Sequence, residues 1–127
     1  MSHRIIAAVA LLSLSSAPGS TQSPDGAAVY ANARCFACHG QMGDGGVGPR
    51  LAGDRMLAIT QFVAARVLLG TSVMPTFADS LKDEEIAAVA TYVRTNWGNQ
   101  FGGVSAEEVQ ATRKLLGVSE PRTAGSK

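Results

Sequence analysis

Cys35, Cys38 and His39 form the motif with the most specific chemistry in this chain. They stand in the order C-x-x-C-H, which is the attachment pattern for c-type haem. On a helical turn the two sulfur atoms project to one side, where they can reach the two vinyl groups of one porphyrin. The imidazole of the following residue can then lie beneath the iron. The motif predicts one covalently bound haem c, with His39 as an iron ligand.

Three other interpretations of these cysteines compete with haem attachment. A thioredoxin-like C-x-x-C needs a βαβ setting, and no strand pattern is visible in the sequence. A plain disulfide between Cys35 and Cys38 would leave His39 without a role. A structural zinc ion needs four ligands, and these three clustered residues cannot supply them. We favour haem and keep a redox-active dithiol without haem as an alternative.

A second axial ligand to the iron must come from elsewhere in the chain. The other histidine, His3, falls in a segment that we predict below to be cleaved. The remaining candidates are methionines, with lysine as a less suitable donor. Met42 lies only three residues after His39 and cannot reach the opposite face of a haem. Met56 stands near the start of a predicted helix, where a methionine is more often core packing.

Met74 is the favoured candidate because of the residue that follows it. Pro75 restricts the preceding residue to an extended backbone, so that a loop can present the sulfur atom. The chain between His39 and Met74 is long enough for a helix and a turn to cross to the other side. The pattern therefore favours Met74 as the ligand opposite His39.

The first 17 residues have the three regions of a secretory signal peptide. A positive start at Arg4 precedes the apolar stretch 5–14, and small residues lead to a cleavage site after Ala17. The apolar stretch is too short to cross a membrane, which takes about 20 residues. Cleavage would lower the formal charge from +1 to zero and leave His39 as the one histidine. We expect a periplasmic protein without a membrane span.

The rest of the chain has the pattern of an all-α protein with long irregular loops. No alternating β-branched run predicts a strand. A polar lead-in at 18–24 and a flexible tail at 119–127 are expected to flank the helices. Helical segments are predicted over 25–38, over 55–69 between an Asp54 cap and a Gly70 stop, from Asp83 to a stop at Gly98, and over 106–116 after a capping box at Ser105. Four helices make a thin core for this length, which suggests that a cofactor fills part of it.

Four motifs together resemble the class I bacterial cytochromes c. The resemblance covers about residues 25–97. It rests on CxxCHG at 35–40, GxGPxLAG at 46–53, GxxxMPxF at 70–77 and DEEIAAVATYVR at 83–94. It implies a small cytochrome c fold over 25–98, with three core helices around a covalent haem. Residues 99–118 would form an extension with a short helix, similar to cytochrome domains that serve periplasmic dehydrogenases.

The resemblance also implies roles for individual residues. His39 and Met74 would be the axial ligands of the iron. The carbonyl of Pro49 would accept the Nδ1 hydrogen of His39, which fixes the tautomer of the imidazole and raises its basicity. Leu51 would pack on the face of the haem.

Further expectations concern the helices. Gly26 and Tyr30 should meet Tyr92 where the first and third helices cross. Lys82 stands where the family usually has a capping serine or threonine, which weakens the expected helix start.

The resulting functional hypothesis is a carrier of single electrons and not an enzyme. A periplasmic dehydrogenase is a possible donor, and an oxidase or another cytochrome a possible acceptor. Nucleic acid is not expected as a partner because the chain has no basic run. The alternative is a pentacoordinate or labile haem that binds gas or reduces peroxide, which would require Met74 to be off the iron.

Several other features receive structural interpretations. Glycines at 43, 45 and 48 match G-x-G-x-x-G, but no strand precedes them, so we expect them to wrap the haem edge and not a phosphate. Asp79, Asp83 and the glutamates are expected to be solvated. Three arginines near the haem-binding segments can meet propionates or a partner: Arg34, Arg50 and Arg55.

Overall fold

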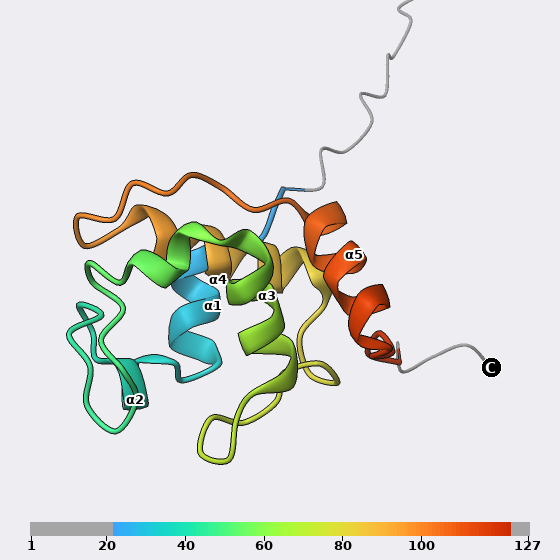
Figure 1. Ribbon diagram of the computed structural model, residues 1–127, viewed down its shortest axis with the longest axis horizontal. Helices are drawn as coiled ribbons and strands as arrows, with labels where there is room; N and C mark the ends of the chain where they lie inside the picture. Colours follow the sequence, from blue (N-terminus) through green and yellow to red (C-terminus); the bar gives the residue numbers. More distant parts are fainter. Residues whose placement is uncertain (1–21, 123–127) are drawn as a thin grey trace, which may run out of the picture.

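The computed structural model describes residues 22–122, so the predicted signal peptide at 1–17 lies outside the described residues. Within 22–122 the chain forms helices and no strand, which confirms the all-α prediction. The elements are α1 (Gly26–Asn32), α2 (Phe36–His39), the 3₁₀ helix η1 (Arg55–Ala58), α3 (Thr60–Leu69), α4 (Asp83–Thr95) and α5 (Ala106–Leu116). Helix α5 lies at the end of the molecule away from α2 (Figure 1). No helix in this part of the chain has the length and apolar character needed to span a membrane.

The predicted helical stretch over 25–38 is broken in the middle. Asp25 caps α1, because its carboxylate accepts a hydrogen bond from the Ala27 amide at 3.0 Å. The helix ends at Asn32, and Arg34 adopts a left-handed backbone with a φ of 59°. This conformation cannot continue a right-handed helix, so the chain turns before α2 begins. The turn gives the C-x-x-C-H segment its own short helix.

Helices α1 and α4 cross with their backbones in close contact. A Cβ atom added to Gly26 would lie 2.7 Å from the Cβ of Tyr92, so only glycine fits at this crossing. The rings of Tyr30 and Tyr92 lie 5.4 Å apart, and Trp97 packs edge-on against both. The expected meeting of Gly26, Tyr30 and Tyr92 is therefore confirmed.

The prediction of one helix over 55–69 is wrong. Asp54 caps η1 through the Met56 amide at 2.9 Å, but Ile59 is extended and a separate helix, α3, begins at Thr60. The buried side chain of Arg94 spans the break, because it donates to the hydroxyl of Thr60 and, at 3.5 Å, to the carbonyl of Ala58. The Ala58 carbonyl thus has a tertiary partner in place of the amide that a continuous helix would have offered. Helix α3 ends at Gly70 as predicted.

Helix α4 begins at Asp83 as predicted but ends earlier than Gly98. Its last residue is Thr95, and Trp97 has a φ of 56°, which no helix residue can adopt. The apolar stripe of this helix is buried, and Ile86 is fully inaccessible. The amide of Lys82 donates to the carboxylate of Glu85 at 2.9 Å. Glu85 therefore provides half of a capping box at the helix start, although the Lys82 side chain offers no acceptor.

The expectation that Asp83 is solvated is wrong. Its side chain is buried and lies 2.8 Å from the guanidinium of Arg113, which is 2% exposed. Asp79 and Glu84 are exposed, as expected. The ion pair was not visible in the sequence because its partners are far apart in the chain and meet only when α5 packs on α4.

Helix α5 forms over the predicted range. Its cap is reciprocal: Ser105 accepts from the Glu108 amide at 3.2 Å, and Glu108 accepts from the Ser105 amide at 2.8 Å. Val109 on its inner face is fully buried between α3 and α4. The extension after α4 is therefore part of the hydrophobic core.

Candidate haem-binding site

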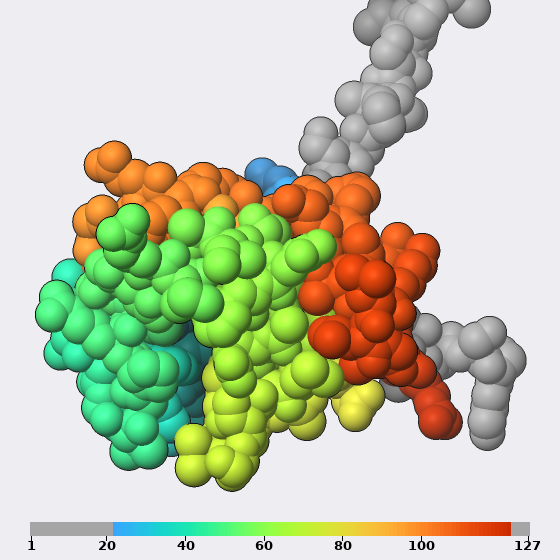
Figure 2. Space-filling view, in the orientation of Figure 1, coloured from blue at the N-terminus to red at the C-terminus, as the bar shows by residue number. Residues whose placement is uncertain are grey.

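A cavity of about 630 Å³ lies between the helices. Figure 2 shows it as a cleft between the segment around residues 33–50 and the surface formed by α3 and the loop after it. Its walls are mainly apolar, and all three core helices contribute to them. They include Tyr30 from α1, Phe62, Val63 and Val67 from α3, and Val89, Ala90 and Val93 from α4.

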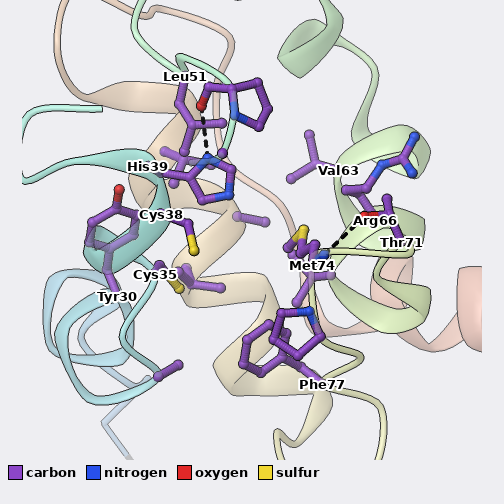
Figure 3. Close-up of a pocket in the computed structure, with 18 of the residues that line it drawn as sticks. Tyr30, Cys35, Cys38, His39, Leu51, Val63, Arg66, Thr71, Met74 and Phe77 are labelled. Carbon is purple, nitrogen blue, oxygen red and sulfur yellow. Dashed lines mark hydrogen bonds between the residues drawn. The ribbon is translucent and has the colours of Figure 1, made fainter. Parts of the chain in front are cut away.

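One wall of the cavity carries the C-x-x-C-H segment. Cys35, Cys38 and His39 all line the cavity, and their side chains lie on the same side of it (Figure 3). The Nδ1 atom of His39 donates a hydrogen bond to the carbonyl oxygen of Pro49 at 2.8 Å. The carbonyl cannot donate, so the bond fixes the tautomer and leaves Nε2 free to bind a metal.

The loop that contains Pro49 packs tightly against the histidine ring. A Cβ atom added to Gly48 would lie 3.0 Å from Cε1 of His39 and 3.2 Å from Cβ of Cys38. The amide of Gly48 also donates to the Cys38 carbonyl at 2.9 Å. The glycine therefore allows the loop to reach the ring.

A buried asparagine behind this loop holds it to the end of α4. The side chain of Asn99 is 4% exposed and has three backbone partners. It accepts from the Gly53 amide at 2.8 Å, and donates to the carbonyls of Leu51 at 3.0 Å and Val93 at 2.7 Å. Leu51 itself lines the cavity. Sequence reasoning missed Asn99, because the groups that it binds come together only in the folded chain.

The opposite wall carries Met74, on the loop between α3 and α4. Its side chain faces the C-x-x-C-H segment across the cavity (Figure 3). The amide of Met74 donates to the Thr71 hydroxyl at 3.0 Å, and its carbonyl accepts from the Thr71 amide at 2.8 Å. A Cβ atom at Gly70 would collide with the backbone of Pro75, at 2.7 Å. The loop therefore folds tightly on itself and presents Met74 inward.

The other two methionine candidates lie elsewhere. Met42 is 64% exposed and Met56 is 46% exposed, and neither lines the cavity. Among the described residues, Met74 is therefore the methionine that shares a cavity with His39.

Comparison with known proteins decides the family. Residues 21–93 match the family model described as cytochrome c oxidase, cbb3-type, subunit III. The chain is also 37% identical over 113 residues to cytochrome c-552 of Thermus thermophilus, in a match that covers 70% of this chain and 84% of that protein. The chain belongs to the class I c-type cytochromes. Family membership confirms the expected covalent haem c and an electron-transfer protein as opposed to an enzyme.

Two further relatives of this cytochrome are subunits of larger proteins. The cytochrome subunit of fructose dehydrogenase from Gluconobacter japonicus is 36% identical over an alignment of 112 positions, in a match that covers 73% of this chain and 23% of that subunit. The cytochrome c subunit of a quinone alcohol dehydrogenase from Gluconacetobacter polyoxogenes is 33% identical over an alignment of 114 positions, in a match that covers 76% of this chain and 24% of that subunit. The cytochrome thus corresponds to one part of each of these subunits.

The cavity of the cytochrome fits haem c in its donors and its polarity. It contains two thiols and an imidazole on one wall and a thioether on the other, and its volume lies within the usual range for cofactor sites, about 300–1,000 Å³. Cys35 and Cys38 are free thiols with no disulfide between them. Burial raises the pKa of the Cys35 thiol. Over residues 22–122 no group of three His, Cys, Asp or Glu side chains offers a separate metal site.

Several cavity residues of the cytochrome were not predicted as site residues. Arg66 and Phe62 on α3 both line the cavity, and the guanidinium carbon lies 5.2 Å from the centre of the Phe62 ring. Of the three arginines expected to meet propionates or a partner, Arg34 lines the cavity, whereas Arg50 and Arg55 do not. The spacing of Phe62 and Arg66 at i and i+4 indicates that they share a helix face, but the sequence does not reveal which face meets the cofactor.

Proposed function

We propose that this cytochrome carries single electrons in the periplasm through one haem c with histidine and methionine axial ligands. Cys35 and Cys38 would form the two thioether bonds. His39 and Met74 would bind the iron from opposite sides. Pro49 would orient the imidazole through its carbonyl, and Leu51 would pack on the haem face.

The observation that supports this proposal most is the placement of two donors across one apolar cavity. His39 lies on one wall with Nδ1 already bonded to Pro49 at 2.8 Å, and Met74 lies on the other wall on a tightly bonded loop. No other methionine among residues 22–122 lines this cavity. A filled sixth position leaves no site for a substrate on the iron, which favours an electron carrier over gas binding or peroxide reduction.

When bound, haem c supplies a one-electron ferric–ferrous couple. The chain tunes that couple through its ligands and through the dielectric of the cavity. A methionine ligand raises the reduction potential. The Pro49 carbonyl makes the His39 imidazole a stronger donor, and the apolar walls contributed by α3 and α4 exclude water.

The spectrum of the holoprotein tests the ligand assignment. The chain is expressed with a haem-maturation system, and acid extraction should leave a c-type haemochrome attached to the protein. The native protein should be low-spin with a far-red sulfur–iron band. Met74→Ala should keep the covalent haem, lose that band and bind carbon monoxide, whereas Met56→Ala and Met42→Ala should match the wild type. An unchanged low-spin spectrum in Met74→Ala would rule out this ligand, and a high-spin wild type would favour the gas-binding or peroxidase alternative.

The proposed location and boundaries come from the sequence. We propose residues 1–17 as a cleaved signal peptide, 18–24 as a polar lead-in, 25–98 as the cytochrome domain, 99–118 as its extension and 119–127 as a flexible tail. Mass spectrometry of the protein from a periplasmic extract should give a chain that begins at Pro18. Recovery of the uncleaved chain from the membrane fraction would contradict this.

The proposed partners are redox proteins, with a periplasmic dehydrogenase as donor and an oxidase or another cytochrome as acceptor. The dehydrogenase subunits among the relatives support the donor class. With a formal charge of zero after cleavage, docking should depend weakly on salt. Stopped-flow reduction of the cytochrome by a quinone-dependent dehydrogenase, repeated at several ionic strengths, tests both points. A steep fall of the rate with added salt would contradict the charge argument.

A further inference from the structure

Arg113 is the most deeply buried charged residue among residues 22–122, and it does not line the haem cavity. It is 2% exposed and lies on the inner face of α5. Its guanidinium bonds to four groups: Asp83 Oδ1 at 2.8 Å, and the carbonyls of Ala78 at 2.9 Å, Leu81 at 3.3 Å and Ser119 at 2.6 Å. Burial of a guanidinium is costly, so this arrangement calls for an explanation.

Two of these partners lie on the chain that leads back from Met74 to α4. Ala78 is four residues after Met74, and Leu81 follows it just before the helix. Asp83 is the first residue of α4. Arg113 therefore ties the end of the Met74 loop and the start of α4 to the C-terminal helix.

The two loop residues that follow Pro75 are tied to α3 by other bonds. The Phe77 amide donates to the Val67 carbonyl at 3.1 Å, and the Thr76 hydroxyl donates to the Leu68 carbonyl. Helix α5 packs against α3 as well as α4, with Val109 fully buried at the contact. The stretch that follows Met74 is thus held to the end of α3 at Thr76 and Phe77, and to Arg113 from Ala78 onward.

Stability alone does not account for this ion pair. The second carboxylate oxygen of Asp83 is buried without a hydrogen-bond partner. An apolar pair of similar volume is often as stable as such an ion pair or more so. What an apolar pair cannot do is bind the two backbone carbonyls of the loop, which a guanidinium can reach with its forked donors.

We propose that Arg113 is a positioning residue for the axial ligand: it anchors the Met74 loop to α5 and so keeps the Met74 sulfur on the iron. The proposal rests on the ligation by Met74 proposed above. It gives the segment after α4 a role in the haem site of the same chain.

Imidazole titration of the ferric holoprotein tests this anchor, because imidazole competes with the Met74 sulfur for the sixth position. Arg113→Met should bind imidazole about tenfold more tightly than the wild type or better, and should weaken the far-red sulfur–iron band. Arg113→Lys should fall between them, since an ammonium can pair with Asp83 but lacks the fork that spans both carbonyls. Lys114→Met is the matched control, because Lys114 is the exposed neighbour on the same helix, and it should not differ from wild type.

A double variant separates anchoring from stability. Arg113→Met alone leaves the Asp83 carboxylate buried without its partner and should lower the denaturation midpoint. Combining it with Asp83→Leu removes that charge and should restore most of the midpoint. If Arg113 anchors the loop, imidazole affinity stays raised in this variant. If affinity returns to the wild-type value, Arg113 acts only through stability and the proposal is overturned.

The same titration distinguishes failure of this inference from failure of the ligand assignment. A wild type with the far-red band and an Arg113→Met variant with wild-type imidazole affinity would overturn the anchor alone. A wild type without that band, whose imidazole affinity equals that of Met74→Ala, would overturn the ligand assignment and the anchor with it.

Discussion

The Nδ1 atom of His39 lies 2.8 Å from the carbonyl oxygen of Pro49 and donates a hydrogen bond to it. The two residues are ten positions apart, and the loop between them has to fold back on the histidine to make this bond. The close approach of Gly48 to the imidazole ring makes the return possible. The geometry of the imidazole therefore depends on the loop as much as on the helical turn that carries it.

Gly48→Ala should destabilise the holoprotein. The added methyl group would lie 3.0 Å from Cε1 of His39, so the ring or the loop must shift. We expect the free energy of unfolding to fall by about 1–3 kcal/mol, as for other overpacked sites. Denaturant unfolding followed at the haem absorption band measures it. Gly103→Ala is the control, because its nearest neighbour, Thr91, is 3.7 Å away; equal midpoints for the two variants would contradict the prediction.

Met74→His should lower the reduction potential and keep a low-spin haem. Imidazole donates more strongly than a thioether and stabilises ferric iron, and axial ligation spans about 0.8 V among haem proteins. Potentiometric titration of the variant beside wild type and Met56→His measures the shift. A potential that does not fall in Met74→His would count against methionine ligation, and Met56→His should leave the potential unchanged.

Asn99→Leu should destabilise the fold near the cavity wall that carries His39. The substitution leaves the Gly53 amide and the carbonyls of Leu51 and Val93 without their side-chain partner. Since an unsatisfied buried group costs about 1–3 kcal/mol, we expect a loss of roughly 3 kcal/mol in the free energy of unfolding. Urea unfolding measures this loss as a lower midpoint, and the m-value should stay the same in the variant and the wild type. Gln100→Leu, at the exposed neighbouring position, should change the midpoint little; a similar loss there would mean that Asn99 has no special role.

Tyr30→Phe should cost stability at neutral pH and less at alkaline pH. Burial, the main cause, raises the pKa of the Tyr30 phenol well above its ordinary value of 10.0, and its hydroxyl donates to the Gly40 carbonyl at 2.8 Å. Below pH 10 the wild type should be more stable than the variant by about 1 kcal/mol. Above pH 10 the unfolded tyrosine ionises while the folded one keeps its proton, so this advantage should shrink as pH rises.

Urea unfolding of both proteins between pH 8 and 11 measures that difference. Comparison of the two proteins at each pH cancels the ionisation of all other groups. A difference that stays constant across this range would show that the folded and unfolded tyrosines ionise alike.

The sequence by itself determined the features that depend on neighbouring residues. The C-x-x-C-H segment and the caps at Asp25 and Ser105 involve atoms no more than four residues apart, so local spacing predicts them. Gly70 ends its helix as predicted, because glycine adopts the positive φ of such a stop without strain. The all-α class and the starts or ends of several helices followed from such signals.

The tertiary structure decided the features in which distant segments meet. Arg94 donates to groups on both sides of the break at Ile59, and Arg113 pairs with Asp83 from 30 positions away. Asn99 binds the loop at Gly53 from 46 positions away. A buried polar side chain forms hydrogen bonds with the groups that packing places beside it, and this packing depends on the whole chain. The sequence could therefore predict candidate donors for a haem site, while the folded chain selects the residues that hold these donors in place.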